Sequence, residues 1–193
     1  MGWMILVWVT IRMMTWKINP IPAFFWFITF FICLPFVRAQ TDTSVVILDD
    51  TGRLTSWEDI IRPFQGQTVY VDLWATWCGP CREEMRHRAE VHVLAERYGV
   101  RLLYLSFDDQ DRYLVWHDYI RDLSIRGSHV FLSEHAQSDL RHRFADGQVD
   151  GRPMLLLPHY LLIDASGEVV VSSAPRPSQK SKLKRLFRRW TGQ

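Results

Sequence analysis

The apolar positions of this chain gather into short runs that predict strands. Residues 68–75 (TVYVDLWA) and 100–107 (VRLLYLSF) are nearly continuous apolar runs, as expected of strands that are covered on both faces. Residues 159–163 and 168–172 are also apolar and flank Asp164-Ala165-Ser166-Gly167, which is a hairpin signature with glycine at the turn. Further short strands are predicted at 44–48 and 129–132.

Between these runs, apolar residues recur at the spacing of amphipathic helices. A long helix is predicted over 80–98, and Gly99 follows it as a typical C-terminal signal. The other helices are predicted at 56–61, 110–123, 134–144 and 178–190. Alternating strands and helices indicate an α/β domain with a central sheet, and the closing hairpin makes that sheet mixed.

The first 39 residues read as a leader. Residues 18–37 carry no charge, Lys17 precedes them and Ala39 suits the position before cleavage, which is the pattern of a secretory signal peptide. The alternative is an uncleaved membrane anchor. Met13 and Met14 lie just ahead of Lys17, so a start at either would give a leader of ordinary length. We therefore expect a leader at 1–39 and one domain at 40–193.

Charge and cysteine content narrow the chemistry. The 193 residues have a net charge of +2, which is too small to indicate a nucleic-acid partner. Of three cysteines, Cys33 lies in the leader, so Cys78 and Cys81 form the one dithiol of the mature chain. The pair must react or bind metal. Zinc would need two more ligands, and the histidines form no recognisable pair, so we expect neither a metal nor a cofactor.

The surroundings of Cys78-Gly79-Pro80-Cys81 favour redox chemistry. The motif directly follows the predicted strand 68–75 and opens the predicted helix 80–98. A nucleophilic cysteine reacts as the thiolate, and a helix N-terminus stabilises negative charge. Cys78 falls at that N-terminus, Cys81 lies one turn inside, and Pro80 fits the first helical turn. The sequence therefore predicts thiol–disulfide exchange by this pair.

The run WATWCGPCREEM closely resembles the thioredoxin-like proteins, and best those of the TlpA/ResA type. The resemblance covers roughly residues 44–190 and is strongest at 69–85 and 158–177. It implies a thioredoxin fold, which is a central mixed sheet flanked by helices. The long segment between Asp108 and Pro158 is similar to an insertion of the TlpA/ResA type, and it implies an extra helix and strand before a cis-proline.

The resemblance also implies roles for two carboxyl groups. Asp72 stands where thioredoxins keep a buried carboxylate, and such a group exchanges a proton with the second cysteine, here Cys81. The alternative is a purely structural hydrogen bond. Glu84 matches a glutamate that ResA-type proteins carry near the active site. Its alternative is a solvated helix glutamate.

Substrate contacts are implied around the motif. In this fold a cis-proline faces the CxxC pair, and Pro158 fits the family pattern, with Leu157 before it. Pro153 does not fit, because Met-Leu-Leu-Leu follows it. Trp77 is expected to be exposed and to touch the partner. Gly79 and Pro80 are expected to contact the substrate.

Two features depart from the family pattern. Arg86 stands where the family usually has a proline that kinks the helix, so a straighter helix is expected. Residues 146–157 (DGQVDGRPMLLL) differ from the usual short approach to the cis-proline, and we expect a loop that shapes the choice of partner.

Together these observations predict an exported protein disulfide reductase of the periplasm or cell envelope. Its expected partners are disulfide-bearing proteins and a membrane electron donor. Membrane contact is expected only through an uncleaved leader, because the basic residues of the helix at 178–190 are typical of a solvated face. An oxidase or isomerase is the alternative, followed by a peroxidase and by a non-catalytic metal or thiol carrier.

Overall fold

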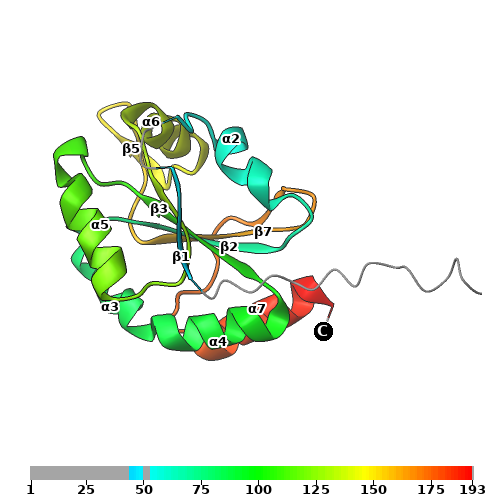
Figure 1. Ribbon diagram of the computed structural model, residues 1–193. Coiled ribbons are helices and arrows are strands. Elements are labelled where there is room, and N and C mark those ends of the chain that lie inside the picture. The colour runs from blue at the N-terminus through cyan, green and yellow to red at the C-terminus, as the bar shows by residue number, and fades with distance from the viewer. Residues whose placement is uncertain (1–43, 50–52, 193) are drawn as a thin grey trace, which may run out of the picture. The chain divides into compact units, whose positions relative to one another are not determined.

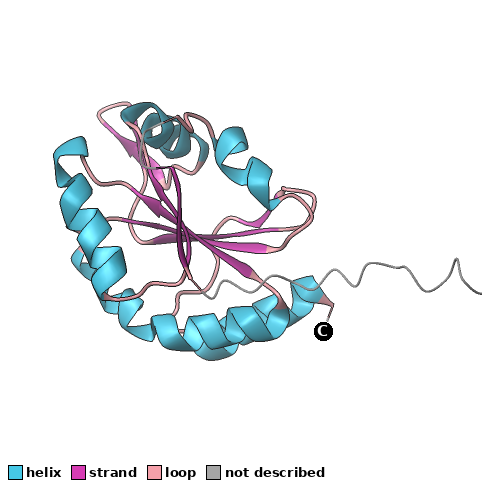
Figure 2. Ribbon diagram, in the orientation of Figure 1, coloured by secondary structure: helices cyan, strands magenta, loops and turns pink. Residues whose placement is uncertain are grey.

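A six-stranded mixed sheet forms the centre of the domain (Figures 1 and 2). The structure is a computed structural model and describes residues 44–49 and 53–192. The strand order is β1-β4-β3-β2-β7-β8. The strands are β1 (Val45–Asp49), β2 (Val69–Trp74), β3 (Arg101–Ser106), β4 (Gly127–Phe131), β7 (His159–Ile163) and β8 (Val169–Val171). The first four run parallel, and β7 pairs antiparallel with both β2 and β8. The predicted α/β fold with a mixed sheet is confirmed.

Helices cover both faces of this sheet (Figure 1). On one face lie α4 (Arg88–Tyr98), α5 (Tyr113–Asp122) and α7 (Lys180–Thr191). On the other lie α2 (Trp57–Ile61), followed by a 3₁₀ turn (Arg62–Phe64), and α6 (Glu134–Arg143). Every residue of β2 is buried, which is why its sequence is apolar except for Asp72.

The long helix expected over 80–98 is interrupted, so the expectation of a straighter helix is wrong. It divides into α3 (Gly79–Glu84), a 3₁₀ turn (Met85–His87) and α4, which ends at Gly99 with φ 64°. The Arg88 guanidinium donates to the carbonyl oxygens of Met85 (3.2 Å) and Leu123 (3.1 Å). One bond lies at the 3₁₀ turn and the other reaches the end of α5, and the helix is interrupted here without a proline.

One glycine of the sheet is required by packing. Gly127 has φ 134°, and a Cβ at this position would lie 2.8 Å from the Tyr104 ring and 3.0 Å from the carbonyl oxygen of Leu102. Any side chain would therefore push β4 away from β3. The sequence prediction began this strand at residue 129 and missed the role of Gly127.

The predicted insert between Asp108 and Pro158 contains a 3₁₀ turn (Gln110–Arg112), α5, β4 and α6. Residues 146–157, expected as a loop, include a small antiparallel hairpin, β5 (Gly147–Val149) with β6 (Arg152–Met154). In the part of the chain that is described, no helix is both long and apolar enough to cross a membrane. The leader predicted at 1–39 lies outside the described residues.

Candidate active site

Cys78 and Cys81 form a disulfide at the start of α3, with an S–S distance of 2.06 Å. Cys78 is the N-cap of the helix in an extended conformation, and its Sγ accepts a hydrogen bond from the Cys81 amide (3.2 Å). Cys78 is 5% exposed and Cys81 1% exposed. The helix N-terminus therefore offers an amide hydrogen bond to the outer sulfur, while the inner sulfur is shielded from water.

Asp72 lies in β2, the strand that leads to this pair, in a row of polar residues that crosses the sheet. It is in register with Tyr104 of β3 and with Tyr160 of β7, and residues in register on neighbouring strands share a face. Asp72 is 4% exposed, and among the described residues its Oδ1 has no hydrogen-bond partner. Burial, and then the negative charge of Glu84, raise the pKa of Asp72 well above its usual range. This carboxyl group can therefore hold a proton at a pH where an exposed aspartate would be ionised.

Glu84 is held by the segment that precedes α7. Its carboxylate accepts hydrogen bonds from the Ser178 amide (2.9 Å) and the Ser178 hydroxyl (3.0 Å). These hydrogen bonds direct Glu84 towards Ser178, while its charge reaches Asp72 and raises the pKa of that carboxyl. This geometry favours a positioning and electrostatic role. The catalytic role predicted for Glu84 stays a prediction.

The peptide bond between Leu157 and Pro158 is cis, as the sequence pattern indicated. His159 pairs with Leu73 across the β2–β7 ladder, so Pro158 lies level with the carboxyl end of β2, where the CGPC loop begins. Pro158 is buried and Leu157 is half-buried. The cis-proline is therefore placed at the same end of the sheet as the disulfide.

The surface at the end of the sheet that carries the disulfide and the cis-proline is partly apolar. Trp77 is 55% exposed and Leu156 is 57% exposed, and Gly79 and Pro80 are also exposed. The Leu156 amide donates to the Asp146 carboxylate (2.7 Å), which ties the residues before the cis-proline to the start of the β5–β6 segment. Substrate contact by these residues stays a prediction.

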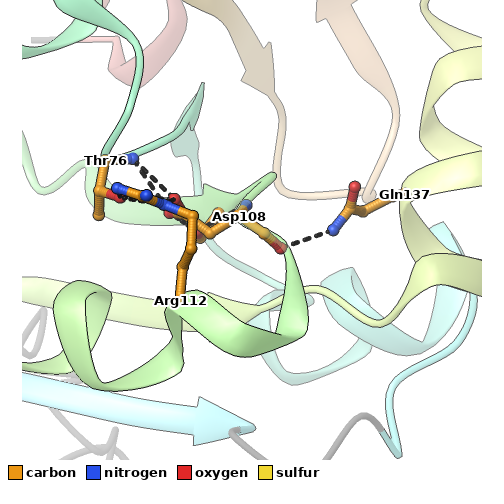
Figure 3. Close-up of polar contacts among 5 residues, drawn as sticks. Thr76, Asp108, Arg112 and Gln137 are labelled. Atoms are coloured by element: carbon orange, nitrogen blue, oxygen red, sulfur yellow. Dashed lines mark hydrogen bonds and ion pairs between the residues drawn. The ribbon is translucent and has the colours of Figure 1, made fainter.

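A buried network that the sequence analysis missed holds the loop before Cys78 (Figure 3). Asp108 follows β3 and is 0% exposed. Its carboxylate accepts from the Thr76 amide (3.0 and 3.1 Å), the Thr76 hydroxyl (2.6 Å) and the Ser106 hydroxyl (2.5 Å). Arg112 pairs with Asp108 (3.3 Å) and donates to Thr76 Oγ1 (2.9 Å). Gln137 of α6 donates to the Asp108 carbonyl oxygen (2.9 Å).

The position of Asp108 in the sequence could have identified it as a candidate site residue. It stands directly after a parallel strand, and the carboxyl ends of neighbouring parallel strands meet at one edge of the sheet, where functional groups gather. Thr76 follows the adjacent strand at the same edge. As for metals, the described residues contain no group of three or more His, Cys, Asp or Glu side chains that would hold an ion.

Comparisons with known proteins agree with this geometry. A model of the Redoxin family matches residues 44–186. The chain belongs to the Redoxin family. The thiol-disulfide oxidoreductase ResA of Bacillus thuringiensis subsp. konkukian is 33% identical over 68 residues, which cover 35% of this chain and 37% of that protein. The chloroplastic thioredoxin-like protein CITRX of Oryza sativa subsp. indica is 31% identical over 70 residues, which cover 36% of this chain and 33% of that protein.

Solved structures align with a larger part of the chain than these sequence relatives do. A thiol:disulfide interchange protein from a Bacteroides species aligns with a TM-score of 0.54 at 19% identity, over 69% of this chain and 78% of that one. A thioredoxin-family thiol:disulfide interchange protein from Chlorobium tepidum aligns with a TM-score of 0.51 at 23% identity, over 68% and 85%. The resemblance to TlpA/ResA-type thioredoxin-like proteins is confirmed, and this Redoxin-family chain has their fold.

Proposed function

We propose that this Redoxin-family protein is a thiol–disulfide oxidoreductase that reduces disulfides of proteins in the periplasm or cell envelope. The observation that carries the proposal is the Cys78–Cys81 disulfide at the start of α3, level with the cis-proline Pro158. The thiol-disulfide oxidoreductase ResA, which this chain matches over 37% of that protein's length, supports the same chemistry.

In the proposed reaction the reduced protein supplies two electrons. The Cys78 thiolate attacks one sulfur of the substrate disulfide, and the other substrate sulfur leaves as a thiolate. Cys81 then loses its proton and attacks Cys78 Sγ, which re-forms the Cys78–Cys81 bond and releases the second substrate sulfur as a thiolate. The released thiolates take up protons, so the substrate gains two electrons and two protons.

Asp72 is suited to accept the Cys81 proton in the second step. Cys81 is almost fully buried, so water has poor access to its thiol. Asp72 is buried on the sheet beside α3 with an oxygen that has no partner among the described residues, and its raised pKa brings it closer to that of a thiol. We assign Asp72 the role of proton acceptor for Cys81.

The oxidised protein must be reduced again, and we infer an electron donor in the membrane. The leader predicted at 1–39 would export the domain, and the CGPC sequence is that of reducing thioredoxins, whose potential is about −270 mV. No further cofactor enters this scheme, because the electrons pass between cysteine sulfurs.

Reduction of insulin disulfides tests the proposal, with two variants that separate the roles of the cysteines. Cys78→Ser is expected to abolish reduction and to form no mixed disulfide. Cys81→Ser is expected to attack once and to accumulate a mixed disulfide with the insulin chain, detectable by mass spectrometry. Full activity of the Cys78→Ser variant would overturn the catalytic role of Cys78 and favour a non-catalytic metal or thiol carrier.

A further inference from the structure

A groove of about 310 Å³ lies beside the redox helix, between the α3 segment and α5. Arg82, Arg86 and Arg88 line one side, and Tyr119 of α5 lines the other. Glu83 is the one acidic residue among the lining residues. The lining therefore carries three positive charges against one negative charge.

Tyr119 shares the lining of the groove with these three arginines. Burial raises the pKa of Tyr119, and the positive charges of Arg82, Arg88 and Arg86 act in the opposite direction. All three arginines are thus close enough to stabilise a negative charge at this point of the groove. A carboxylate placed beside the Tyr119 hydroxyl would meet the same field, together with a hydrogen-bond donor.

The arginines differ in how firmly they are held. Arg88 is fixed by its hydrogen bonds to the Met85 and Leu123 carbonyl oxygens. Arg86 pairs with Glu83 at 3.2 Å, but both side chains are largely exposed, and such a surface pair contributes little. An incoming carboxylate can therefore replace Glu83 as the partner of Arg86.

This groove is lined by residues of the same helical segment that carries the dithiol. Arg82, which lines the groove, directly follows Cys81 in α3, and its amide donates to the Cys78 carbonyl oxygen (3.2 Å). The ring of Tyr119, which lines the groove, packs against Trp74 with ring centroids 5.5 Å apart, and Trp74 lies four residues before Cys78. A chain whose disulfide meets Cys78 would extend naturally along this groove.

We propose that the groove between α3 and α5 docks an acidic segment of the protein whose disulfide reacts at Cys78. The inference rests on the proposed function and adds the charge of its partner. Arg82 and Arg86 attract the acidic segment during encounter, and Arg88 with Tyr119 fixes a carboxylate at the centre of the groove.

The test uses the full chain, reduced beforehand, and three synthetic peptides that share one disulfide loop. The residues that flank the loop are acidic, neutral or basic. The rate constant for disulfide reduction is measured with each peptide at low and high salt. We expect the wild-type protein to prefer the acidic peptide over the neutral one, with a preference that falls as salt rises.

The double variant R82Q/R86Q is expected to lower the ratio of the acidic to the neutral rate constant by about threefold to tenfold. Because the ratio compares two peptides on one protein, it removes any change in the reactivity of Cys78 itself. The matched control is R185Q/R188Q, which removes two exposed charges from α7 and is expected to leave the ratio within about twofold of wild type.

Three results would overturn the inference. The first is equal reduction of the acidic and neutral peptides by the wild-type protein. The second is a wild-type ratio in the groove variant, and the third is an α7 control that lowers the ratio as much as the groove variant does. Each of these leaves the proposed reductase function standing. Reduction of none of the peptides would overturn the proposed function and the docking inference together.

Discussion

Replacing Asp108 with asparagine isolates the network that holds the CGPC loop. The change keeps the shape of the side chain but removes its charge and turns one acceptor oxygen into a donor. In the structure both oxygens are used by donors: Thr76 N and Oγ1, Ser106 Oγ and Arg112 Nε. One end of the asparagine must therefore face a group that donates towards it, in a site that is fully buried.

The size of the effect follows from these contacts. A hydrogen bond to a charged group contributes about 1.5–3 kcal/mol, and breaking a buried charged pair costs about 3–5 kcal/mol. Arg112 is 35% exposed, so water can solvate it after the change, which places the loss near the lower limit. We expect D108N to reduce the free energy of unfolding of the oxidised protein by about 3 kcal/mol.

The assay is denaturant unfolding of the oxidised protein, followed by tryptophan fluorescence. The matched control is D109N, the same substitution at the exposed neighbouring residue, for which a change within about 0.5 kcal/mol is expected. A loss below about 1 kcal/mol for D108N, or an equal loss for D109N, would refute the claim that this carboxylate holds the loop.

Three further predictions concern titratable groups. Because the folded-state pKa of Asp72 is raised, its contribution to stability falls as pH rises from about 4 towards that pKa. The D72N variant should therefore have a higher unfolding midpoint than the wild-type oxidised protein at neutral pH. The same variant should release insulin more slowly from the mixed disulfide. E84Q removes a charge that raises the pKa of Asp72, so the pH profile of that release step should shift to lower pH; an unchanged profile would contradict the coupling. Burial lowers the pKa values of His92 and His129 to about 4, so between pH 6.5 and 4 the unfolded state binds more protons than the folded state. Lowering the pH from 7 to 5 should therefore reduce the free energy of unfolding by about 2 kcal/mol for each histidine. Denaturant unfolding at pH 7 and pH 5 measures this loss, which H129F should reduce; equal losses in H129F and wild type would count against it.

The sequence predicted best those features that depend on residues adjacent to one another along the chain. The CGPC spacing placed both cysteines correctly at a strand–helix junction, and the pattern Pro158 to Gly167 located the cis peptide bond and the hairpin after it. The apolar runs predicted the succession of the main strands and helices along the chain. Each of these depends on a few adjacent positions, which is why a single sequence carries them.

Contacts between distant segments were not predictable in the same way. Thr76 and Asp108 are 32 residues apart, and Glu84 and Ser178 are 94 apart, so no local pattern links them. The break in the helix at Met85–His87 depends on carbonyl contacts made by Arg88, one of them with Leu123 on another element. The strands β5 and β6 have three residues each, which is too short for alternation to be recognised.

The reduction potential of the Cys78–Cys81 pair tests the central claim most directly. The full chain would be equilibrated with glutathione or dithiothreitol buffers, and the fraction of disulfide read by thiol labelling. We predict a value near or below about −250 mV, as for a reductase supplied by a membrane electron donor. A value above about −180 mV would contradict it and indicate an oxidase or isomerase, whose partners would regenerate the disulfide instead.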